Sequence, residues 1–209
     1  MIKLIRVLGM AVALSLSLSA VAEAQKEPES TKIAREGSEA AKAGDWDKAI
    51  DAFRKAAEMD HKWTPSLSAA LQQRAVKRRT DQDFQGAETD LTEALKVSPK
   101  DAGIHERRAY VEMKLNKNDA ALADYTEAIK INPQEVRYYL LRSYIYEVKG
   151  DIKNSMADTD HVLSIDKNNA EAKARKERLQ KIEAMKATAQ ANAPGATPIP
   201  APSAQPKKK

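Results

Sequence analysis

The chain has 209 residues, a formal net charge of +5 and no cysteine. The lack of cysteine excludes disulfide bonds and a lipid-modified cysteine. Three of the positive charges are the lysines at residues 207–209, so the basic charge is largely an end effect. Binding of nucleic acid calls for a clustered basic face, and we therefore expect no nucleic-acid partner.

Residues 1–24 have the pattern of a secretory signal peptide. Lys3 and Arg6 precede an apolar run over residues 7–18, which is shorter than the ~20 residues that a membrane-spanning helix needs. Small residues then alternate as a cleavage pattern at Ala20, Ala22 and Ala24. We expect cleavage after Ala24, with Ala22 as the next best site, and an uncleaved membrane anchor is the alternative interpretation.

Export without cysteine is compatible with a bacterial periplasm. We therefore expect a periplasmic or secreted protein with no stable transmembrane segment after cleavage of the signal peptide. A short polar linker, residues 25–29, precedes the folded part.

The sequence then repeats itself with a period of 34 residues. Small or apolar residues recur at fixed offsets, and proline closes the first two of three copies. The recurring positions are Ala87, Ala121 and Ser155; Leu91, Tyr125 and Thr159; Ala94, Ala128 and Val162; and Pro99, Pro133 and Lys167. This period with these residue types is the signature of an array of helix–turn–helix repeats.

The repeats resemble the tetratricopeptide repeat (TPR) family, whose pattern is W-x2-L-G-x2-Y, then A-x3-F, then P. The second half of the pattern is matched by Ala49-x3-Phe53, Ala87-x3-Leu91, Ala121-x3-Tyr125 and, more weakly, Ser155-x3-Thr159. In the first half, small residues stand at the glycine position and arginine replaces the leucine. The resemblance covers roughly residues 30 to 169 and implies an all-α fold. This fold is a right-handed superhelix (α-solenoid) of about four TPR repeats with a C-terminal capping helix.

The expected repeats span residues 30–63, 68–101, 102–135 and 136–169. Trp46 and Phe84 are equivalent positions but lie 38 residues apart, so four extra residues separate the first two repeats. Thr is a good N-cap and Pro a favoured first helical residue. Thr64-Pro65 therefore predicts an early start of the next helix, with Trp63 covering the joint.

The hairpin turns have their own residue signals. Gly150 and Asn116 stand where a positive φ is often needed, and both residue types tolerate it. Gln82 occupies the same place in the second repeat and predicts a less tight turn there.

Residues 170–188 predict a last helix with a narrow apolar stripe of Leu179, Ile182 and Met185. Repeat arrays need a polar cap at the exposed end, and this helix suits that role. From residue 189 the chain is rich in Ala, Pro, Gln and Ser and ends in lysines. Residues 189–209 are therefore expected to be disordered.

Arginine and aspartate recur in two further columns, with each arginine 16 residues before its aspartate. The resulting pairs are Arg74–Asp90, Arg108–Asp124 and Arg142–Asp158. Two antiparallel helices joined by a short turn bring such positions side by side, so we predict one ion pair per repeat. The first repeat has Glu36 and Ala52 at these places and lacks both partners together, which favours pairing. Two independent solvated columns are the alternative.

In the TPR family, the first helix of each repeat lines a concave groove that binds a protein or peptide. This resemblance places nine residues on the groove: Gln72, Val76, Arg79, Glu106, Tyr110, Met113, Arg137, Leu140 and Tyr144. Tyr, Met and Arg are enriched in interfaces. The alternative is that these tyrosines only pack between repeats. Tyr139 and Tyr146 are expected to face the core.

Some TPR co-chaperones hold a terminal carboxylate with a clamp of Lys, Asn and Arg, and no Asn is found among the nine groove residues. No catalytic, metal or cofactor site is expected either. His61, His105 and His161 share no spacing, and no H-x3-H pair, nucleophile elbow or phosphate loop occurs. We expect these histidines at the surface or at joints between repeats, and we expect no enzyme activity.

The sequence therefore predicts a non-catalytic adaptor or scaffold of the cell envelope that binds an unidentified protein or peptide. The alternative is an envelope-surface or polymer-binding module that acts through the proline-rich tail and its lysines. Deletion of residues 189–209 distinguishes the two, because only the polymer-binding module needs the tail. The sequence does not indicate an oligomeric state.

Overall fold

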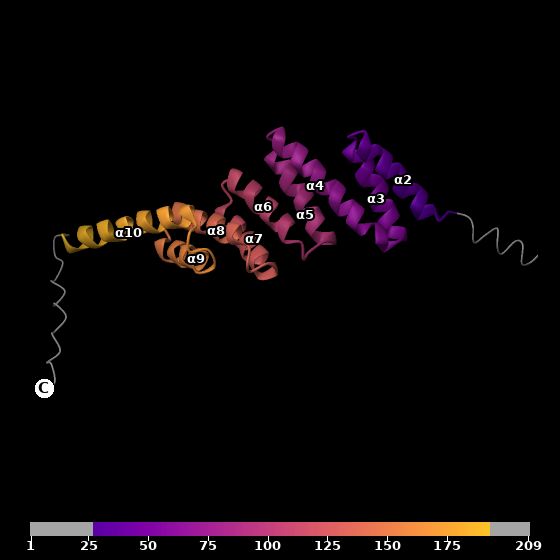
Figure 1. Ribbon diagram of the computed structural model, residues 1–209. Coiled ribbons are helices and arrows are strands. Elements are labelled where there is room, and N and C mark those ends of the chain that lie inside the picture. The colour runs from indigo at the N-terminus through magenta and orange to yellow at the C-terminus, as the bar shows by residue number, and fades with distance from the viewer. Residues whose placement is uncertain (1–26, 193–209) are drawn as a thin grey trace, which may run out of the picture. The chain divides into compact units, whose positions relative to one another are not determined.

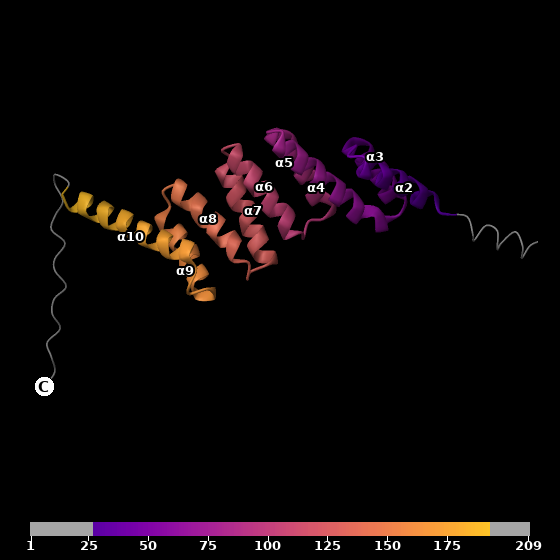
Figure 2. The same cartoon turned by 45° about the horizontal axis from the view of Figure 1, so that its top comes forward.

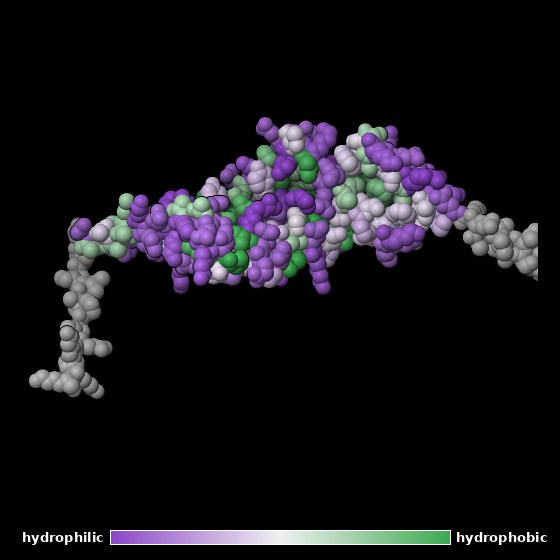
Figure 3. Space-filling view, in the orientation of Figure 1, coloured by the Kyte–Doolittle hydropathy of each residue, from purple (hydrophilic) through white to green (hydrophobic). Residues whose placement is uncertain are grey.

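The computed structural model describes residues 27–192, and every regular element within them is helical (Figures 1 and 2). The chain divides into two compact units, Met1–Pro99 and Lys100–Lys209. Polar side chains cover much of the face drawn in Figure 3, and apolar residues form separate patches. None of the helices in residues 27–192 is long and apolar enough to cross a membrane.

The first unit contains two helical hairpins. They are formed by α2 (Glu29–Lys42) with α3 (Trp46–Met59) and by α4 (Thr64–Thr80) with α5 (Phe84–Val97). Asp45 and Asp83 cap α3 and α5, and each carboxylate accepts the backbone N–H three residues later. A Cβ added at Gly37 would lie 3.2 Å from the Cβ of Ala52. The small residue therefore lets α2 approach α3 closely.

The second unit contains two further hairpins and a final helix. The hairpins are α6 (Ala102–Lys114) with α7 (Asn118–Ile131) and α8 (Val136–Val148) with α9 (Ile152–Ile165), and α10 (Ala170–Ala191) packs against α9. Tyr125 is fully buried in one cluster with the small residues Ala109 and Ala121 and with Tyr138 and Ile145. Burial of large aromatic and small aliphatic residues at the period of the repeat stabilises the unit.

All four hairpins use the same turn. Gly44, Gln82, Asn116 and Gly150 have φ values of 77°, 62°, 59° and 76°. The expectation of a less tight turn at Gln82 is wrong, because closing the hairpin imposes the left-handed conformation on glutamine as well. This conformation costs an L-residue roughly 1–2 kcal/mol, and the packing of α4 against α5 offsets that cost.

The joint between the first two repeats contains a short 3₁₀ helix, His61–Trp63, immediately before α4. Thr64 is the first residue of α4 rather than its N-cap, and Trp63 stands in the cap position without a side-chain cap bond. The expected Thr cap is therefore wrong, because the 3₁₀ turn already orders the chain up to Trp63. The Trp63 ring is half-buried, and Lys62 Nζ lies 5.4 Å from its centre.

The buried side of α10 lies nearer the N-terminus of the helix than the stripe that the sequence predicts. Leu179 is fully buried and Ile182 half-buried, but Met185 is 69% exposed. Ala172 and Arg175 complete the buried stripe. The reason is length: α10 has 22 residues and α9, against which it packs, has 14, so at 1.5 Å per residue the last turns of α10 extend beyond their partner.

α10 also continues to Ala191, so residues 189–191 are helical and not part of the expected tail. The alanines at 187, 189 and 191 favour helix and explain the extension. The expected signal peptide with Ala22 and Ala24, and the lysines at residues 207–209, lie outside the described residues.

Candidate partner-binding face

Three arginine–aspartate pairs hold the hairpins together from inside. In Arg74–Asp90, Arg108–Asp124 and Arg142–Asp158, the arginine Nε and Nη2 donate to both carboxylate oxygens over 2.6–3.0 Å. All three aspartates are buried. The hydrogen bond to its aspartate raises the pKa of the Arg74 and Arg142 guanidinium groups. The structure thus brings together all six residues as bidentate pairs.

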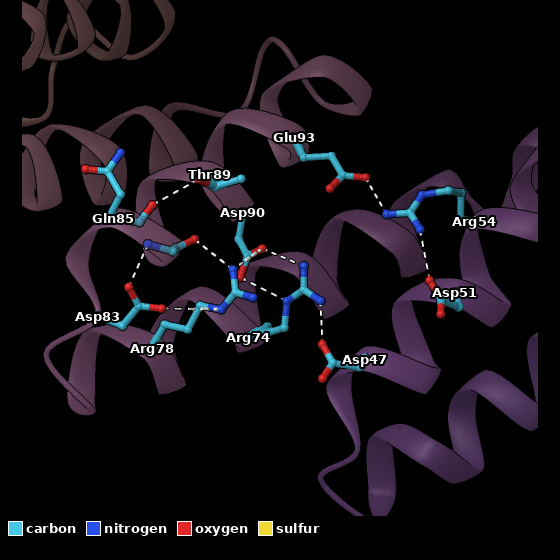
Figure 4. Close-up of polar contacts among 11 residues, drawn as sticks. Asp47, Asp51, Arg54, Arg74, Arg78, Asp83, Gln85, Thr89, Asp90 and Glu93 are labelled. Atoms are coloured by element: carbon cyan, nitrogen blue, oxygen red, sulfur yellow. Dashed lines mark hydrogen bonds and ion pairs between the residues drawn. The ribbon is translucent and has the colours of Figure 1, made fainter.

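Two of these pairs have additional contacts that do not recur in the other repeats. Arg78 Nη1 donates to Asp90 at 2.9 Å, and Arg74 reaches Asp47 of α3 at 2.6 Å (Figure 4). His105 Nδ1 lies 2.9 Å from Asp124, and its side chain is 12% exposed. The expectation of a surface or joint position is wrong for His105, because its ring occupies the inside of the α6–α7 hairpin beside the aspartate. Arg78 and His105 do not recur at the 34-residue period, so the sequence pattern did not indicate their role.

The first helices of the second unit present one mixed face, which we call the tyrosine face. α6 contributes Glu106, Tyr110 and Met113, and α8 contributes Arg137, Leu140, Tyr144 and Val148. The spacing of three or four residues puts each set on one side of its helix. Tyr110, Tyr144 and Val148 are 38%, 46% and 58% exposed. The sequence pointed to all of these residues except Val148, which follows Tyr144 by one helical turn.

Ion pairs tie the tyrosine face together. Arg137 of α8 pairs with Glu106 of α6, and this contact raises the pKa of the guanidinium. Arg178 of α10 donates from Nε and Nη2 to Glu147 of α8 at 2.7 and 2.9 Å, which lowers the pKa of that carboxyl. α6, α8 and α10 are therefore linked side by side through charged side chains.

A buried arginine supports Tyr144 from α10. Arg175 Nη1 donates to the backbone oxygen of Leu140 at 2.6 Å, and Nη2 donates to Glu171 at 2.8 Å. Its guanidinium carbon lies 5.9 Å from the centre of the Tyr144 ring, which is within the range of a cation–π interaction. Burial lowers the pKa of Arg175. Sequence reasoning missed this residue because it treated α10 only as a polar cap.

The remaining tyrosines divide into buried and half-buried ones. Tyr139 is buried, its hydroxyl donates to the oxygen of Pro133 at 3.2 Å, and its ring lies 4.1 Å from that of His161. Tyr146 is half-buried, with the Arg142 guanidinium 5.9 Å from its ring. Tyr138, which the sequence did not single out, is also buried.

The other predicted groove residues, Gln72, Val76 and Arg79, lie on α4 of the first unit. Val76 is 37% exposed, and Gln72 donates to Ser68 Oγ at 3.3 Å. Since they belong to the first unit, we define the candidate site on the second unit alone. Among residues 27–192, no group of three or more His, Asp or Glu side chains is placed to hold a metal ion.

Comparison with known proteins agrees with this architecture. Residues 73–136 and 107–159 match the model of the tetratricopeptide repeat family. A tetratricopeptide repeat protein from Parabacteroides merdae is similar over 77% of this chain and 62% of its own, with 20% identity and a TM-score of 0.59. No curated protein matches the chain.

Two single TPR domains are also similar in structure. The first TPR of Spaghetti (RPAP3), bound to the HSP90 peptide SRMEEVD, has a TM-score of 0.52 and 20% identity over 56% of this chain and 93% of its own. The Arabidopsis OM64 TPR domain has a TM-score of 0.51 and 27% identity over 55% and 95%. The family model supports tetratricopeptide repeats within residues 73–159 of this chain, and the solved structures share its all-α fold.

Proposed function

We propose that this chain is a non-catalytic adaptor whose tyrosine face binds a segment of a partner protein. The observation that carries the proposal is the joint exposure of Tyr110, Tyr144 and Val148 on one linked set of helices. Aromatic residues in a mixed apolar and charged setting are typical of interfaces. The TPR of Spaghetti, with its bound HSP90 peptide, supports the use of this fold for peptide binding.

We further propose that the adaptor is exported and works in the cell envelope. The support is the pattern of residues 1–24, with Lys3 and Arg6 before a short apolar run and small residues after it. The chain then meets its partner outside the cytoplasm.

The experiment starts with capture of partners from envelope extract on the immobilised mature chain. Tyr110→Ala and Tyr144→Ala are then compared with the parent chain for affinity toward the captured partner. Truncation of an aromatic anchor commonly costs ~2 kcal/mol or more, and ~1.4 kcal/mol is tenfold in affinity. Each change should therefore weaken binding at least about tenfold while the melting temperature stays close to that of the parent.

Ile165→Ala is the matched control, because Ile165 is 39% exposed but lies on α9, a second helix. It should leave affinity unchanged. Tyr138→Ala removes a buried ring and should lower the melting temperature instead. If both exposed tyrosine variants bind normally but melt early, these tyrosines are packing residues and the proposal is wrong.

A further inference from the structure

Three glutamates, one each on α6, α8 and α10, are already neutralised by arginines of the chain. Glu106 pairs with Arg137, Glu147 with Arg178, and Glu171 with Arg175. These arginines are correspondingly engaged, and a partner that bound them would have to break existing pairs. The charge left over on this face must come from other side chains.

Two lysines supply that charge. Lys114 follows Tyr110 by one helical turn, and its Nζ lies 5.4 Å from the ring centre. Lys181 follows Arg178 by three residues on α10 and therefore lies on the same side of that helix. Among the described residues, neither lysine takes part in an ion pair with an acidic group. Both are exposed.

The order of the helices places apolar surface between the two cations. α8, with Tyr144 and Val148, is linked to α6 on one side and to α10 on the other. Lys114 stands on α6 and Lys181 on α10. A lysine ammonium is a compact charge on a flexible stem, which suits single carboxylates better than a bidentate fork. Charge complementarity favours a partner that carries negative charge on both sides of an apolar centre.

We infer that the tyrosine face recognises an internal acidic segment of a partner protein, with aliphatic or aromatic residues at its centre and Asp or Glu on both flanks. The inference rests on the proposed function and specifies its ligand. The centre of the segment lies against Tyr110, Tyr144 and Val148, and its flanking carboxylates approach Lys114 and Lys181. A free C-terminal carboxylate is not required, because the arginines of the face are held by its own glutamates.

Three synthetic peptides test the inference on the full mature chain. Each has about ten residues, which reaches about 33 Å when extended, with a leucine–phenylalanine centre. The flanks are glutamate, glutamine or lysine, and both termini are blocked. In fluorescence anisotropy at about 50 mM salt, the glutamate peptide should bind about tenfold tighter than the glutamine peptide, and the lysine peptide most weakly. At about 500 mM salt the difference should largely disappear because exposed charges are screened.

Lysine variants test which side chains cause the preference for the glutamate peptide. K114Q/K181Q should reduce the advantage of the glutamate peptide to about threefold or less, while the glutamine peptide binds as before. K153Q/K167Q removes the same charge from α9 and the loop after it, and should change neither. Equal binding of glutamate and glutamine peptides would overturn the inference but leave the proposed function standing. If none of the three peptides binds, the inference is wrong, and the partner experiment with Tyr144→Ala judges the proposed function separately.

Discussion

Asp90, Asp124 and Asp158 are carboxylates inside a helical hairpin, and each depends on the arginine sixteen residues before it. Such a pair is weak evidence for net stability, because removing two charges from water is costly. Loss of one partner has a different effect, since it leaves the other charge buried without compensation. The pairs therefore make each hairpin sensitive to a single substitution.

Arg142→Ala and Asp158→Ala should each lower the free energy of unfolding by about 3–5 kcal/mol, because each strands a buried charge. The double variant should lose at least ~1 kcal/mol less than the two single losses added. Urea unfolding followed by circular dichroism measures all four proteins. Additivity within ~0.3–0.5 kcal/mol would show that the two residues do not interact. This pair avoids the second partner of Asp124, which His105 also contacts, although Arg142 itself also donates to Thr126 Oγ1 at 3.0 Å.

The sequence predicted these pairs because both columns follow the 34-residue period. It could not predict Arg78 or His105, which contact Asp90 and Asp124 but occur in one repeat each. Gln82 is a related case. Its side chain gives no signal for a positive φ, and the conformation comes from closing the hairpin.

At the scale of elements, α8 and α9 meet through hydroxyl groups where other repeats use alanine and a large residue. Ser143 Oγ lies 3.1 Å from Ser155 Oγ and 3.0 Å from Thr159 Oγ1, and all three residues are buried. Buried hydroxyls are tolerated when they are hydrogen-bonded. The fourth repeat therefore matches the family pattern weakly because its two helices approach each other through hydrogen-bonded hydroxyl groups instead of alanine and a large residue.

α10 shows which part of a capping helix contributes to stability. Leu179→Ala should lower the free energy of unfolding by about 2–5 kcal/mol, since it removes a fully buried side chain and leaves a cavity. Met185→Ala on the same helix should change it by no more than about 0.5 kcal/mol, because Met185 is exposed. Chemical denaturation of both variants measures the difference. Equal losses of unfolding free energy in the two variants would contradict the exposed position of Met185.

The sequence predicted α10 and two residues on its packed side, Leu179 and Ile182, but it extended the stripe to the exposed Met185. Hydrophobic spacing indicated Leu179, Ile182 and Met185, whereas the buried set is Ala172, Arg175 and Leu179. Arginine is rarely buried, so no pattern rule selects it. Only the carbonyl of Leu140 and the carboxylate of Glu171 in the folded unit explain its position.

At the scale of the whole molecule, the period and the small-residue columns were sufficient for an all-α array. They were not sufficient for the binding face, because a repeat position alone does not give exposure. Tyrosine is buried at Tyr138 and Tyr139 but exposed at Tyr110 and Tyr144. That distinction depends on which helix lies beside each ring.

A further prediction at the scale of the whole chain concerns cleavage of the signal peptide. If residues 1–24 direct export, the exported protein should begin at Gln25. N-terminal sequencing and intact mass of the protein recovered from the envelope or the medium measure this. Ala24→Leu should slow or move the cut, whereas Ala43→Leu, far from the cleavage pattern, should not. Recovery of the uncut chain in the membrane fraction would contradict the prediction.

The position of each buried aspartate and its arginine within one hairpin has a consequence for how such a chain can change length. A deletion that removes residues 102–135 takes away Arg108 together with Asp124 and leaves the other two pairs intact. A cut of the same size that begins at residues 118–124 of α7 removes Asp124 and Arg142, but it places Asp158 sixteen residues after Arg108, which is the spacing of a pair within one hairpin. A cut of a different length that begins there moves Asp158 away from that spacing. The length of the change therefore matters more than the place of its breakpoints, because a gain or loss of 34 residues keeps each arginine sixteen residues before an aspartate. One repeat length is thus the unit in which this array can grow or shrink.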